Sequence, residues 1–181
     1  RVADSALFLV DAVAGVEVGT ELTWGHAGDT LPRMVLVAKM DRENASFERA
    51  INSLNGHFEA QFVPLVLPIG SQNDFAGVVD VVRMKAYMGA EAEEAEIPAG
   101  MSDQVDEARM QLIEVAAESD DELIMKYLEG EELSPDEISR GLQGSIAEGA
   151  VVPVLAASGL SGIGVRTVMD AIASYMPAPP E

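Results

Sequence analysis

The sequence has no cysteine, few aromatic residues and few bases: 5% of its 181 residues are aromatic, and 11 Lys and Arg face 31 Asp and Glu, for a net charge of −20. The absence of cysteine excludes a disulfide-stapled secreted module. The shortage of bases argues against direct binding to DNA or RNA, because each phosphate contact needs a cation. A basic protein partner suits this surface better. No apolar run nears the roughly 20 residues of a membrane span and no export signal is visible, so we expect a cytoplasmic protein without membrane contact.

Apolar residues make up 48% of the chain, which is enough for a buried core. Runs at 6–10, 33–38 and 151–156 predict buried strands, the first of them buried on both faces. The predicted helices that alternate with them are 16–27, 46–58, with Ser46 as its N-cap, and 163–175. This alternation indicates a parallel, doubly wound sheet.

The middle of the chain breaks this alternation. Segments 62–69 and 77–87 predict strands of a second sheet, in which Pro64 and Pro68 suit an edge. An acidic loop at 89–100 follows, and then three helices, whose expected first residues or caps are Ser102, Asp120 and Ser134. We therefore expect an α/β fold with a partial doubly wound parallel sheet at 1–60 and 151–176, an inserted acidic α+β subdomain at 61–150, and the start of a linker at 177–181.

Several side chains that invite a special role have a simpler structural interpretation. Trp24 and the nine Met are expected in the core, as are the apolar stripes of the helices. His26 and His57 are expected at the surface or at helix ends, without the neighbours that catalysis needs. The apolar stripes are Val105, Ala108, Met110, Leu112, Ile113 and Ala116 in one helix, and Ile163, Val168, Met169, Ile172 and Tyr175 in the last helix.

In an open parallel sheet, ligands bind beyond the carboxyl ends of the strands. The segments found there are 11–15, 38–41 and 157–160. The Asp41 carboxylate can accept two hydrogen bonds from one edge of a guanine, and the Lys39 stem can lie over the base. Small residues at 157–159 would let backbone N–H groups reach a base carbonyl. Alternatively, Asp41 simply caps the following turn.

Further stretches extend this pattern along the whole chain: RVAD at 1–4, DAVAGV at 11–16, KMDREN at 39–44, GVVD at 77–80, KYLEGEEL at 126–133 and SGLSGIGV at 158–165. With these stretches the chain resembles the second half of the GTP-binding domain of the elongation factor G family of translational GTPases, together with its inserted subdomain. The resemblance implies a P-loop GTPase fold that lacks its first half.

The resemblance also implies a guanine site. The family's N-K-x-D box falls on positions 38–41 and its serine-containing fifth box on 158–160, so the implied guanine-binding residues are Lys39, Met40, Asp41, Ser158, Gly159 and Leu160. Ala38 replaces the expected Asn, which should weaken base binding roughly ten- to a hundredfold, as expected when a polar partner is lost. Gly159 replaces the usual Ala, which loosens the loop but keeps its backbone donors.

The phosphate-binding half of such a site is missing from this sequence. There is no G-x-x-x-x-G-K-[ST] loop, and the D-x-x-G spelled by Asp74 to Gly77 follows the base-reading box where the family has it before, so we interpret it as a turn between strands. The intact protein is expected to hydrolyse GTP, with GTP or GDP and Mg as cofactors. We expect this chain alone to be inactive, with no catalytic residue, no metal site and no bound cofactor.

An acidic face on the first helix of the insertion is the second candidate site. Its residues are Asp103, Glu107, Gln111, Glu114 and Glu118. By composition alone this is a solvated helix face, whereas as a functional surface it would attract a basic partner. The resemblance implies contact with the stalk protein of the large ribosomal subunit.

Taken together, these features predict a monomeric piece of an elongation factor that promotes tRNA and mRNA translocation on the ribosome. Two alternatives remain open. One is a related translational GTPase of the ribosome-protection or release-factor type, and the other is a non-enzymatic acidic interaction module.

Overall fold

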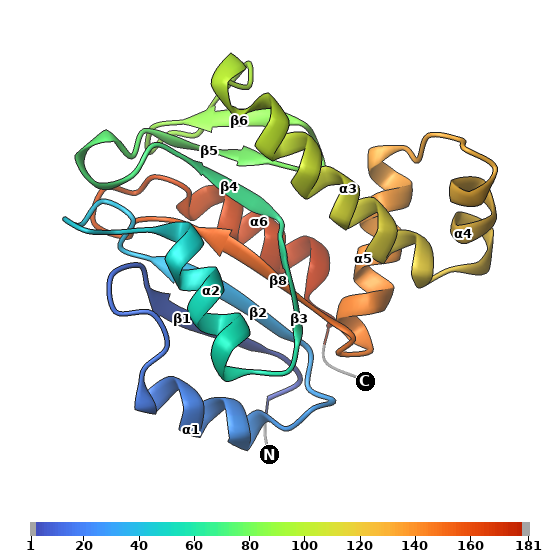
Figure 1. Ribbon diagram of the computed structural model, residues 1–181, viewed down its shortest axis with the longest axis horizontal. Helices are drawn as coiled ribbons and strands as arrows, with labels where there is room; N and C mark the ends of the chain where they lie inside the picture. Colours follow the sequence, from blue (N-terminus) through green and yellow to red (C-terminus); the bar gives the residue numbers. More distant parts are fainter. Residues whose placement is uncertain (1–2, 179–181) are drawn as a thin grey trace.

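The computed structural model describes residues 3–178, so Arg1, Val2 and positions 179–181 of the expected linker lie outside the described residues. Two four-stranded sheets and their helices form an α/β fold (Figure 1), which confirms the predicted fold class. The first sheet is entirely parallel and has the spatial order β1 (Ala6–Asp11), β2 (Arg33–Ala38), β8 (Val151–Ala156) and β3 (Gln61–Pro64). Its helices are α1 (Val18–Ala27), α2 (Phe47–His57) and α6 (Val165–Tyr175).

The second sheet is antiparallel and consists of β4 (Val66–Ile69), β5 (Gly77–Asp80), β6 (Lys85–Met88) and β7 (Glu93–Ala95). The predicted strand at 62–69 is therefore wrong as a single element. It divides at Leu65, whose N–H donates to Val154 in the parallel sheet and whose carbonyl accepts from Val81. Because residues 62–69 are almost all apolar, the sequence gives no sign that the chain passes from one sheet to the other at Leu65. The expected insertion boundary at 61 also needs correction, since the antiparallel part begins at Val66.

Two further predictions about the insertion are corrected. The segment 77–87 forms a hairpin of two strands, because the Asp80 side chain accepts a hydrogen bond from the Arg83 N–H and closes a turn. The expected loop at 89–100 contains β7 and the 3-10 turn Ala99–Met101. Because β7 is short and fully exposed, it has no apolar alternation that would mark a strand.

Three helices complete the insertion: α3 (Ser102–Glu118), α4 (Asp121–Leu128) and α5 (Pro135–Ala147). The predicted cap of α5 is confirmed, since Ser134 forms a capping box with Glu137. Asp120, expected as the first residue of α4, is instead its N-cap and accepts from two backbone N–H groups. Ser102 does not cap α3, because its hydroxyl donates to the carbonyl of Ala99, the first residue of the preceding 3-10 turn.

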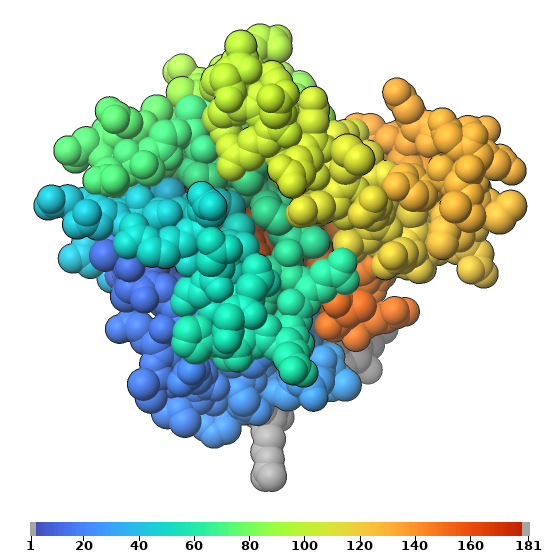
Figure 2. All heavy atoms as spheres, in the orientation of Figure 1, coloured from blue at the N-terminus to red at the C-terminus, as the bar shows by residue number. Residues whose placement is uncertain are grey.

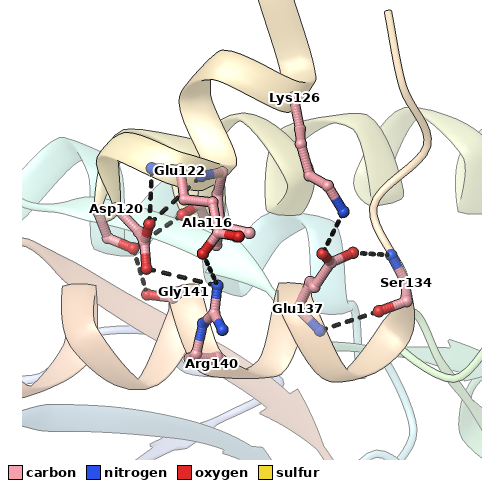
Figure 3. A network of polar contacts seen from close by, with 10 residues as sticks. Ala116, Asp120, Glu122, Lys126, Ser134, Glu137, Arg140 and Gly141 are labelled. Carbon is pink, nitrogen blue, oxygen red and sulfur yellow. Dashed lines mark hydrogen bonds and ion pairs between the residues drawn. The ribbon is translucent and has the colours of Figure 1, made fainter.

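Polar contacts tie these helices together (Figure 3). Lys126 of α4 pairs with Glu137 of α5, and Arg140 lies 3.6 Å from the Asp120 carboxylate. The Glu137 carboxylate also accepts from the Ser134 N–H. The hydrogen bond from Lys126 is the main cause that lowers the pKa of Glu137 to about 2. These contacts fix α4 against α5 although α4 is short.

Trp24 lies in the core beneath the parallel sheet, as predicted. Its ring stacks on Phe58 at 4.4 Å between centroids, Phe8 lies 4.9 Å away, and the Arg33 guanidinium covers it at 4.3 Å. Such contacts stabilise beyond simple burial. His26 and His57 occupy the last turns of α1 and α2, which confirms their predicted positions. Ser46 caps α2 by accepting from the Arg49 N–H.

Some apolar residues expected inside are exposed. The predictions are wrong for Met110 (61% exposed), Met125 (56%), Met169 (64%) and Ile172 (37%). Strand β1 is not buried on both faces either, because it is the edge of the sheet and its Leu9 is 61% exposed. A sequence pattern marks apolar residues but does not show which surfaces other segments cover. Within residues 3–178, none of the helices is both long and apolar enough to cross a membrane.

Candidate functional site

A pocket of about 570 Å³ lies at the carboxyl ends of β1, β2 and β8. This is the position where open parallel sheets bind ligands. Its wall is mainly apolar, with Leu36, Leu160 and Val168 among the lining residues, and Lys39 and Asp41 lie at its polar end. Of the three segments predicted at strand ends, 38–41 and 157–160 line the pocket, whereas 11–15 does not line it and joins the site through the contact of Asp11 with Lys39. The pocket combines an apolar wall with a few charged groups, as ligand sites do.

In the loop after β2, some side chains line the pocket and another is buried in the core. Lys39 adopts a positive φ of 61°, and it lines the pocket together with Asp41. Met40 between them is fully buried, and its N–H donates to the Ala157 carbonyl. The expectation that Met40 belongs to the guanine site is therefore corrected: its side chain is part of the core, and its backbone joins the two loops of the site.

The Asp41 carboxylate is available to a ligand. Across residues 3–178 it makes no hydrogen bond or ion pair, and the turn after β2 is closed by the backbone, where the Arg42 N–H donates to the Lys39 carbonyl. The alternative in which Asp41 caps this turn therefore finds no support. A half-buried carboxylate beside a pocket, without a partner in the protein, can accept hydrogen bonds from a bound molecule.

The loop after β8 presents backbone to the same pocket. Ser158 is fully buried, and its hydroxyl accepts from the Ser161 N–H, so its side chain shapes the loop and does not line the pocket. Gly159 and Leu160 do line it, and Leu160 is 91% exposed. Open space surrounds the position where a Gly159 Cβ would stand, so neither Gly nor Ala is required there by packing.

Ala38 closes β2 and contributes only a methyl group to the pocket. Its neighbour in the parallel register is Asp11, whose carboxylate accepts from the Lys39 ammonium at 2.7 Å and lies 3.6 Å from the Arg42 guanidinium. The hydrogen bond from Lys39 is the main cause that lowers the pKa of Asp11 to about 2. Sequence reasoning placed Asp11 at a strand end but missed this contact, which depends on the strand register.

The Asp74–Gly77 motif forms a turn that packs against the loop after β2, where the Gln72 N–H donates to the Met40 carbonyl. Asp74 ends the 3-10 turn Gln72–Asp74 and Gly77 begins β5, so the motif forms the connection between β4 and β5, as predicted. In the described part of the chain, no group of three or more His, Cys, Asp or Glu residues could hold a metal ion.

The acidic face of α3 is exposed along its length, and α3 runs diagonally across the surface in Figure 2. Two of its residues, Glu107 and Gln111, line a groove of about 380 Å³ between α2 and α3, together with Phe47 and Ile51 of α2. Glu114 accepts a hydrogen bond from the Tyr127 hydroxyl. The five exposed residues are Asp103, Glu107, Gln111, Glu114 and Glu118.

Comparison with known proteins gives a family and a related structure for this fold. The family model described as the elongation factor Tu GTP binding domain matches residues 1–178. A Thermus thermophilus protein of known crystal structure superposes with a TM-score of 0.87 at 35% sequence identity, over 98% of this chain. The matched region is 27% of that protein, so the chain spans about a quarter of its length.

Proposed function

Because this chain belongs to the elongation factor Tu GTP-binding domain family, we propose that it is the guanine-binding part of a translational GTPase of the elongation factor G type. The observation that carries this proposal is the unpartnered Asp41 carboxylate, placed beside Lys39 and the Gly159 loop around one pocket. The intact protein would promote translocation of tRNA and mRNA on the ribosome, in the cytoplasm, as a monomer.

Recognition of guanine follows from the groups around the pocket. The Asp41 carboxylate accepts from the N1–H and the exocyclic amine of the base, which adenine cannot offer in this arrangement. The Lys39 stem covers one face of the ring, and backbone N–H groups at Gly159 and Leu160 face the base carbonyl. The defining test is selectivity: GDP should bind and ADP should not.

Hydrolysis requires more than this chain. The sequence holds no phosphate-binding loop, so nothing in it orients a γ-phosphate or the Mg²⁺ that GTP carries. The chain contributes the base-binding residues, and the catalytic and metal-binding groups belong to the rest of the polypeptide. For this chain alone we expect no hydrolysis and weak nucleotide binding, because the phosphates find no partner.

The acidic face of α3 is proposed as the docking surface for the basic stalk protein of the large ribosomal subunit. The supporting observations are the exposure of its carboxylates and the excess of acids across the insertion. Opposite charge raises the association rate and the specificity of a complex more than its affinity.

Charge reversal tests this docking surface. We expect the affinity for the stalk protein to fall at least tenfold in the triple variant Glu107→Lys, Glu114→Lys, Glu118→Lys. The reason is that the reversed charges would repel a basic partner. The melting temperature of the variant should stay nearly unchanged, because all three side chains are exposed. Surface plasmon resonance at two salt concentrations measures both affinity and association rate.

The matched control reverses three other exposed acids of the insertion, Glu129, Glu131 and Glu132. It carries the same change of net charge, so it should keep most of the binding if the α3 face is the contact. Equal losses in both variants would mean that the overall charge of the insertion, and not this face, attracts the partner.

Ala38 favours one second candidate, a ribosome-protection or release-factor paralogue. Without an amide at position 38 the base is held by fewer hydrogen bonds, which suits a related GTPase with weaker nucleotide binding. The run KYLEGEEL at 126–133 favours the elongation factor.

A further inference from the structure

The carboxylate of Asp11 is held in one orientation at the end of β1. Its Oδ1 accepts from the Val13 N–H at 2.8 Å and from the Ala14 N–H at 3.3 Å. Its Oδ2 accepts from the Lys39 ammonium at 2.7 Å. The side chain of Asp11 is only 13% exposed, whereas that of Lys39 is 55% exposed. A fixed, shielded carboxylate therefore anchors a long and otherwise mobile side chain.

The anchored lysine crosses from one strand end to the next. Lys39 leaves the backbone after β2 with a positive φ, lines the pocket, and ends on Asp11 after β1. Its methylene stem is therefore stretched along the pocket edge. A free lysine would lose side-chain entropy on covering a ligand, and an anchored one has already lost most of it.

Asp11 lies next to Ala38, the position where the site lacks a polar side chain. The two residues are register partners in the parallel sheet. The contact between Asp11 and Lys39 thus links the ends of β1 and β2 at the place where a side-chain amide is missing. Arg42, 3.6 Å from the same carboxylate oxygen, adds a second positive charge to this corner.

We propose that Asp11 is a positioning residue for guanine-nucleotide binding, which holds the Lys39 stem over the base site and compensates in part for Ala38. The proposal rests on the proposed function, because it needs a guanine nucleotide in this pocket. Asp11 itself touches no nucleotide and acts through Lys39.

Isothermal titration of GDP into the intact polypeptide, with Asp11→Asn, Lys39→Met and the double variant, tests this role. Asparagine keeps an oxygen that accepts from Val13 and Ala14, so the turn should fold. Asp11→Asn should weaken GDP binding about fivefold, the size expected for a partly exposed ion pair. In the Lys39→Met background the same change should have no further effect.

The control is Glu137→Gln, which removes another carboxylate–lysine pair, neither residue of which lines the pocket, and should leave GDP affinity unchanged. Equal or tighter binding by Asp11→Asn would overturn the proposal, as would an equal loss in both backgrounds, since a merely structural role does not depend on Lys39. If the unmodified polypeptide binds GDP no better than ADP, the proposed function itself fails, which is a different result.

Discussion

Asp41→Asn should weaken GDP binding by about a hundredfold, or about 2.7 kcal/mol, because two hydrogen bonds to a charged acceptor are lost or reversed. The asparagine amide would point a donor at the exocyclic amine of guanine, which is also a donor. Xanthine carries a carbonyl at that position, so the variant should prefer XDP to GDP. Titration of the intact polypeptide with both nucleotides measures this reversal.

Asp74→Asn is the matched control. It neutralises the exposed aspartate of the Asp74–Gly77 motif, in the connection between β4 and β5, and should leave both affinities unchanged. A loss of GDP binding in this control would revive a phosphate-binding role for that motif. Retention of GDP preference by Asp41→Asn would remove Asp41 from base recognition.

Gly141→Ala should destabilise the protein by about 2–3 kcal/mol, the upper range for overpacking a tight contact. Gly141 lets α5 lie directly on α3, and a Cβ there would stand 2.4 Å from the Ala116 carbonyl oxygen. The Ser119 hydroxyl at the end of α3 also donates to the Gly141 carbonyl, so the helices cannot separate without losing this bond. We expect the melting temperature to fall by about 4–12 °C, as measured by circular dichroism.

The control lies one turn further along the same helix. At Gly144 the nearest atoms to a new Cβ belong to the Ser119 side chain at 3.7 Å, an ordinary contact. Gly144→Ala should therefore be neutral or stabilise by up to about 1 kcal/mol through helix propensity. If both variants shift the melting temperature equally, close packing of α5 on α3 is not what requires Gly141.

Local signals in the sequence predicted local structure well. The caps at Ser46 and Ser134 were correct because each depends on residues within one helical turn. The alternation of strands and helices was enough for the parallel sheet, since that pattern leaves few arrangements. Lys39 and Asp41 could be chosen as candidate site residues because they follow directly after a predicted strand, and both line the pocket.

Features that depend on distant segments were missed. The division at Leu65 is set by pairing with β8 and β5, which the apolar run 62–69 does not reveal. Exposure of Leu9 follows from the edge position of β1. The contact between Asp11 and Lys39 needs the register of two strands, and the burial of Met40 needs the position of the Ala157 loop.

Guanine recognition at this pocket can be tested by backbone amide NMR of this chain, titrated with GDP and with ADP. We expect weak, guanine-specific shifts at 38–42 and 158–161, with no comparable response to ADP. Equal responses to the two nucleotides, or shifts confined to other parts of the chain, would contradict guanine recognition at this pocket.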